Sequence, residues 1–171
     1  LTGKISEDRG KRRDYVTHAC AMAAYQGLSD IKAPDLKKMI AEFGDAKADE
    51  IVEITKAVLD ALTVLAKINK QINYTLVQKW IYVDLVWMIM QLHADNKTPN
   101  STKIAQKYVE FEKLRKQFTA HPEEILVAGK YPEITRPMKK HLFDYIVAFK
   151  AQGATHGNLQ ILNSAIRAFC L

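Results

Sequence analysis

Apolar residues recur at intervals of three and four along nearly the whole chain, the spacing of one face of an α-helix. No pair of stretches with alternating apolar and polar residues indicates a β-hairpin. The seven glycines and five prolines are few, and the prolines stand near the edges of apolar segments. The pattern therefore predicts an all-α fold of about seven or eight helices.

The expected helices follow one another along the chain and are separated by glycine-containing or polar stretches. We expect a short helix within residues 121–137 and a last helix after 153–157. In the first three helices, Val16, Ile40 and Ile51 are among the side chains expected to face the core. The approximate ranges of the other helices are 12–25, 34–44, 46–68, 74–93, 101–119 and 137–152.

The segment YTLVQKWIYVDLVWMIMQLH, residues 74–93, differs from the others because it is apolar on all sides. A helix of this kind is normally buried, so we expect it at the centre of the bundle. Its apolar run is shorter than the roughly 20 residues that a bilayer requires, and Asp84 interrupts it. We therefore expect a core helix and no membrane span.

Asp84 is the most unusual residue of that helix. A buried carboxylate must be paired or protonated. The available partners are His18, His93, Lys79 and Arg167, and we expect Asp84 and Arg167 to be buried polar residues. A pair that fixes the register of the helices and an acid with a functional role both remain open.

The charge of the chain is positive and uneven. The formal net charge is +6, and the isoelectric point is about 9.2. Residues 30–60 hold five lysines against eight acidic residues, whereas residues 101–171 hold eleven lysines and arginines against six acidic residues. This balance permits contact with nucleic acid and predicts a polarised molecule, whose basic side comes from the second half and the first dozen residues.

The stretch GKRRDYVTHACAMAAYQG, residues 10–27, places three cations at the start of a helix. Cations are unfavourable there because the helix dipole is positive at this end. Contact with phosphate would offset that cost, and so would an ion pair with Asp14 or with an acid of residues 30–60. A second basic face is expected on the helix 137–152. The predicted nucleic-acid-binding residues are Lys11, Arg12, Arg13, Arg136, Lys139 and Lys140.

Arg115 precedes His121 by six residues in RKQFTAH. This spacing is similar to the arginine–histidine motif of HEPN ribonucleases. In that family the two side chains, paired across a helical dimer, act on RNA phosphate as acid–base and charge stabiliser. The resemblance implies an alternative function for this chain, a ribonuclease that uses Arg115 and His121.

Other catalytic or metal-binding patterns are missing from the sequence. The five histidines form no HExxH motif, and Cys20 and Cys170 stand at opposite ends of the chain without a CxxC partner. We therefore predict no metal, no cofactor and no catalytic site. Two isolated cysteines are typical of a reduced, cytoplasmic setting.

The order of segments resembles the helical region of the GmrSD-type restriction family. The resemblance covers most of the chain, with Arg12, Arg13 and Asp14 matching the family's Arg-x-x-Asp-like start and Arg167 its closing helix. In that family an N-terminal domain resembling ParB and sulfiredoxin carries the nucleotide-dependent activity. Its Asp-Gly-Gln-Gln-Arg signature is absent here, as is a His-Asn-His motif. The resemblance thus implies a supporting helical region whose partner is an upstream catalytic domain.

Together these observations favour a non-catalytic helical module that binds DNA in a DNA-targeting defence protein. We expect one domain, residues 1–171. Because the first residue is Leu1 rather than Met, a fragment of a longer protein is the alternative. A protein-interaction module also remains open, with residues 30–60 or 121–137 as the contact surface.

Overall fold

The computed structural model describes residues 10–45, 48–151 and 154–171. These residues form seven α-helices and one short 3-10 helix, and they contain no strand. The predicted all-α fold is confirmed. The helices are α1 (Lys11–Ala24), α2 (Ala33–Gly44), α3 (Ala48–Gln71), α4 (Lys79–Ala94), α5 (Ser101–Phe118), η2 (Pro122–Leu126), α6 (Arg136–Lys150) and α7 (His156–Cys170).

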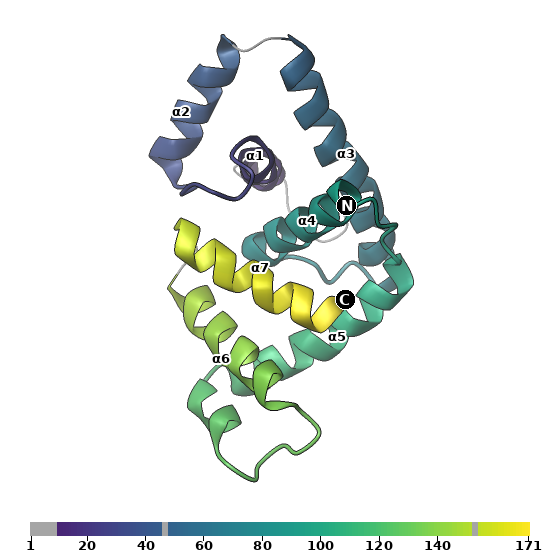
Figure 1. Cartoon of the computed structure of the whole chain (residues 1–171), viewed down its shortest axis with the longest axis vertical. Helices are drawn as coiled ribbons and strands as arrows, with labels where there is room; N and C mark the ends of the chain where they lie inside the picture. The colour runs from purple at the N-terminus through teal and green to yellow at the C-terminus, as the bar shows by residue number, and fades with distance from the viewer. Residues whose placement is uncertain (1–9, 46–47, 152–153) are drawn as a thin grey trace.

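Two helices share the centre of the bundle (Figure 1). Helix α4 packs against α1, α3 and α7, and helix α7 packs against α4, α5 and α6. The prediction placed the segment 74–93 alone at the centre. The structure adds α7, which links the upper group of α1 to α4 to the lower group of α5 and α6 in Figure 1.

Helix α4 is buried almost all round, as its sequence predicts. Every residue from Ile81 to Val86 is buried, including Asp84, which has no exposed surface. Full burial explains why this helix shows no apolar stripe: neighbours cover it on every side. Among the described residues, no helix has the length and apolar character needed to cross a membrane.

Helix α4 begins at Lys79, five residues later than predicted. Asn73 and Tyr74 have positive φ angles of 54° and 58°. These left-handed conformations turn the chain after α3 and interrupt a right-handed helix at this point. The side-chain oxygen of Asn69 then accepts a hydrogen bond from the backbone N–H of Leu76 at 3.2 Å. A short loop with a buried leucine therefore stands where a helical turn was expected.

Three apolar residues expected in the core are exposed instead. Val16 is 37% exposed, Ile40 is 61% exposed and Ile51 is 38% exposed. Helix α2 packs on α1, and the first half of α3 extends past α4, so the two helices spread apart at the top of Figure 1. Their outer apolar positions consequently have no covering element.

Several local features agree with the sequence. Pro34 lies in the first turn of α2, and the Asn100 side chain caps α5 by accepting a hydrogen bond from the Lys103 N–H at 3.0 Å. The short helix expected within 121–137 is η2, and an irregular stretch follows it. The expected break at 153–157 lies partly outside the described residues, and α7 begins within it at His156.

Candidate phosphate-binding surface

The first turn of α1 is an uncapped helix end that carries cations. Gly10 occupies the N-cap position with a positive φ of 70°, and no side chain of the residues that the structure describes caps this helix start. Lys11 and Arg13 are exposed, while Arg12 is partly buried. The positive end of a helix dipole, which is the partial charge of the first backbone N–H groups, favours anions, and the cations of this turn add to it.

Asp14 does not neutralise these cations. Its carboxylate lies 3.3 Å from Nδ1 of His18 and 3.3 Å from Nζ of Lys79. Arg12 makes a contact of its own, but Lys11 and Arg13 form no ion pair within the described part of the chain. Pairing with Asp14 was one of the predicted ways to offset the cost of a basic helix start, and the structure assigns that carboxylate to other partners.

A pocket of about 600 Å³ begins beside Asp14. His18 lies in its wall with only 6% of its side chain exposed. The ring of His18 meets the ring of Trp80 edge-on at 5.4 Å between centroids, and Nζ of Lys79 lies 4.7 Å from the Trp80 ring. The sequence predicted His18 and Lys79 only as partners for Asp84. The Asp14–His18 spacing of four residues on one helix is the pattern that indicates their pairing.

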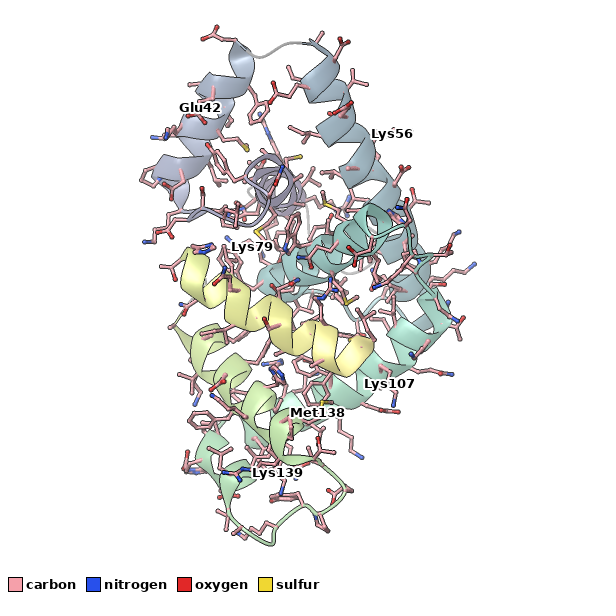
Figure 2. All side chains as sticks on the ribbon, in the orientation of Figure 1. Glu42, Lys56, Lys79, Lys107, Met138 and Lys139 are labelled. Carbon is pink, nitrogen blue, oxygen red and sulfur yellow. The ribbon has the colours of Figure 1, made fainter. Side chains whose placement is uncertain are left out.

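The other predicted basic residues lie elsewhere. Arg136, Lys139 and Lys140 belong to the start of α6, and Figure 2 shows Lys139 near the end of the molecule opposite α2. Lys140 forms an ion pair with Asp144 at 2.6 Å, and the Lys139 amine donates to the backbone carbonyl of Lys130. The six predicted binding residues therefore form two separate patches, and those of α6 are partly engaged within the protein.

Arg115 and His121 are not brought together. The Arg115 guanidinium donates to both oxygens of Glu112, at 2.6 and 2.8 Å, and lies 4.9 Å from the ring of Phe149. The Glu112 hydrogen bonds raise the pKa of Arg115. His121 is 70% exposed and lies 3.4 Å from Glu123. Arg115 thus serves the packing of α5 against α6, and it is turned into the protein while His121 faces solvent.

Asp84 has a different partner from those predicted. The hydroxyl of Tyr145 on α6 donates to one Asp84 oxygen at 3.4 Å, and the other oxygen has no hydrogen-bond partner among the described residues. None of the four predicted partners contacts it in the described structure. Burial raises the pKa of Asp84 well above its usual value, and the Tyr145 hydrogen bond only partly opposes this. Burial therefore favours the protonated, neutral form of Asp84.

Arg167 is partly exposed rather than buried. Its guanidinium donates to the side chain of Gln91 at 2.9 Å and lies 4.0 Å from Asp95, with 31% of its side chain exposed. These contacts fasten α7 to the end of α4. Arg167 does not contact Asp84.

A second cavity, larger than the pocket beside Asp14, was not foreseen. It measures about 970 Å³ and lies between α1, α3 and α4, with Trp87 and Met90 in its wall and Glu53 and Lys56 among its polar residues. No motif marks it because its residues come from three helices. No cluster of metal-binding side chains occurs among the residues that the structure describes.

No protein-family model, curated protein or solved structure matches this chain.

Proposed function

We propose that the chain is a helical module that binds nucleic acid through its phosphates, with the first turn of α1 as the main contact. The observation that carries the proposal is the state of Asp14. Asp14 is the acidic residue of that turn, and its carboxylate contacts His18 and Lys79. The exposed cations Lys11 and Arg13 remain available to an external anion.

The electrostatics of a helix start support phosphate as that anion. Lysine and arginine at the positive end of a dipole cost stability by roughly 0.3–1 kcal/mol each, and a bound phosphate reverses the sign of that interaction. Lys11 and Arg13 lie two residues apart in the first turn of α1, so both charges stand at the same end of the helix but point to different sides of it. Such a turn can contact consecutive phosphates of a backbone without reading bases.

DNA is the proposed nucleic acid. The choice rests on the resemblance of the segment order to the helical region of GmrSD-type restriction proteins, and it extends to an upstream catalytic domain as partner. The alternative ribonuclease receives no support from the geometry, because Arg115 is bonded to Glu112 and His121 is exposed elsewhere.

The proposal is tested by anisotropy titration of labelled duplex DNA, single-stranded DNA and RNA at about 50 mM salt, where phosphate contacts are strong. The variant K11E/R13E is compared with K67E/K113E. Lys67 and Lys113 are exposed, and each double variant lowers the formal charge by the same amount.

We expect K11E/R13E to weaken DNA binding by roughly tenfold or more, because it replaces two contacts by repulsion. The control should lose much less, since its net charge is identical but its position differs. Equal losses in the two variants would show that only net charge matters and would contradict the assignment to α1. Tighter binding of RNA than of either DNA would contradict the choice of DNA.

A further inference from the structure

A small pocket lies where the end of α1, helix α4 and helix α7 meet. It measures about 310 Å³, and none of the described side chains that line it is charged. Its wall holds instead the ring of Trp87 and the side-chain amides of Gln26, Gln91, Gln160 and Asn163. Neutral polar groups around an aromatic ring fit a neutral, flat ligand that forms hydrogen bonds at its edge, and they offer little to an ion.

Asn163 is a buried amide without a partner. The residue is only 7% exposed, and its Nδ2 has no hydrogen-bond partner in the described structure. An unpaired N–H group costs free energy when it is buried, because it has lost the hydrogen bond that water would provide. The Asn163 side chain lines the pocket. A ligand that accepts a hydrogen bond there would therefore pair this N–H group.

Gln91 provides a second donor. Its Oε1 accepts a hydrogen bond from the Arg167 guanidinium at 2.9 Å. A guanidinium only donates, so this contact fixes which end of the Gln91 amide is the oxygen. Nε2 keeps its N–H groups and has no hydrogen-bond partner among the described residues. The pocket therefore has one amide donor on α4 and one on α7, and a fitting ligand must bring acceptors.

Trp87 forms a flat wall that is held in place from one side. The backbone of Gly27 lies against its ring, because a Cβ at Gly27 would stand 3.1 Å from Cε2, Cζ2 and Nε1. The ring also lines the neighbouring cavity of about 970 Å³, which shares Gln26 and Gln91 with the small pocket. The two hollows are therefore joined beside Trp87. A ring bound in the small pocket can carry a substituent, such as a sugar, into the larger one.

We infer that this pocket binds an oxo-nucleobase, such as hypoxanthine or guanine. The carbonyl oxygen and N7 of these bases lie on one edge, and both accept hydrogen bonds. They would pair the N–H groups of Gln91 and Asn163, while the flat base packs on Trp87. Adenine has an amino group in place of the carbonyl, so it would leave one of the two donors unpaired.

The base has two possible sources, a free nucleoside and an unpaired position of a nucleic-acid strand. The pocket lies at the end of α1, whereas Lys11 and Arg13 lie at its start. The 14 residues of this helix span about 21 Å at 1.5 Å per residue. Binding of a free nucleoside is therefore independent of the α1 surface. Only the strand form of the inference rests on the proposed function.

The test measures the affinities of inosine and adenosine by isothermal titration calorimetry. The two nucleosides differ at position 6, where inosine has a carbonyl and adenosine an amine. The first variant is Gln91→Glu, which keeps an oxygen toward Arg167 and replaces the Nε2 donor by an acceptor. Its control is Gln117→Glu, which adds the same charge at an exposed site on α5. Asn163→Leu is the second variant and removes the buried donor.

A parallel anisotropy titration distinguishes the two sources of the base. It compares an all-adenine single strand of DNA with the same strand that carries one central hypoxanthine. The melting temperature of each variant without ligand shows that it is folded.

We expect the natural protein and Gln117→Glu to bind inosine about tenfold or more tightly than adenosine. This is the modest end of the discrimination shown by sites that hydrogen-bond a ligand and leave a donor unpaired with its analogue. Gln91→Glu and Asn163→Leu should lose the preference. Inosine 5′-monophosphate should bind no more tightly than inosine, since none of the described side chains that line the pocket is charged.

The outcomes separate the two sources of the base. An inosine preference that Gln91→Glu removes, with equal binding of the two strands, assigns a free nucleoside to the pocket, whatever the α1 surface binds. Tighter binding of the hypoxanthine strand that the same variant removes assigns an unpaired base and supports the proposed function. Absence of any preference, for nucleoside and strand alike, overturns the inference and leaves the α1 surface intact. So does a preference that folded Gln91→Glu retains.

Discussion

The first turn of α1 and the interior between α4, α5 and α6 both contain charged or ionisable groups. They differ in whether these groups have partners within the protein. In the interior, Arg115 has both oxygens of Glu112 and the ring of Phe149, and Asp84 has the hydroxyl of Tyr145. On α1, Lys11 and Arg13 have no acidic partner in the described structure. The difference separates charges that stabilise the fold from charges that are available to a ligand.

Removing the buried cation should have the largest effect on stability. Arg115→Met keeps the length of the side chain but leaves Glu112, which is only 15% exposed, with Lys116 as its remaining partner at 3.3 Å. Breaking a buried pair costs about 3–5 kcal/mol, and Lys116 should hold the loss near the lower end. Urea denaturation measures it.

The control for this prediction is Lys113→Met, an exposed lysine two residues before Arg115 on the same helix. Affinity for DNA, measured per folded molecule, should be unchanged in both variants. A loss of DNA affinity in folded Arg115→Met would remove the distinction between interior charges and ligand-binding charges.

Asp84→Asn tests the neutral state of the buried acid. The native state holds the Asp84 proton at a raised pKa, while the unfolded chain releases it near pH 4. The free energy of unfolding of the natural protein therefore falls as pH rises above 4, until pH passes the raised pKa of Asp84. The variant has no such proton. Over this range the free energy of unfolding of Asp84→Asn should rise relative to that of the natural protein by up to about 1.4 kcal/mol per pH unit.

Denaturation of the natural protein and of Asp84→Asn at several pH values between about 5 and 8 measures this difference. A constant difference over the range would mean that Asp84 is ionised in the native protein. Tyr145→Phe is the companion variant, because it removes the hydrogen bond that favours the ionised form. It should raise the pKa of Asp84 further.

The start of α6 is the intermediate case, and its variant should have the smallest effect. The triple variant R136E/K139E/K140E removes three cations, but Lys140 already pairs with Asp144 and Lys139 is bonded to the Lys130 carbonyl. We expect it to weaken DNA binding only a few-fold, through long-range charge. A loss larger than that of K11E/R13E in an anisotropy titration would make α6 the main surface.

The features that the sequence predicted correctly depend on neighbours along the chain. The all-round burial of α4 and the short helix within residues 121–137 each follow from a few adjacent residues. The basic turn of α1 is also local. The sequence predicted its three cations at the start of a helix, and the structure adds that Lys11 and Arg13 are exposed.

The features that the sequence missed depend on contacts between distant residues. Asp14 meets Lys79 from another helix, and Asp84 meets Tyr145, which is 61 residues away. The pocket beside Asp14 takes its lining from α1, α2, α4, the C-cap residue of α6 and the start of α7. Helical periodicity predicts the apolar face of each helix but not the helix against which that face packs. These pairs could therefore be found only in the packed structure. The exposed Ile40 and Ile51 are errors of the same origin.

The central claim is that Lys11 and Arg13 contact phosphate. Its most direct test is the salt dependence of duplex DNA binding by the natural protein and by K11A/R13A, measured between about 50 and 200 mM salt. Neutral replacements remove contacts without adding repulsion. If both cations contact phosphate, the slope of log affinity against log salt should become shallower by about 1.8 in the variant. An unchanged slope, whatever the change in affinity, would contradict the claim.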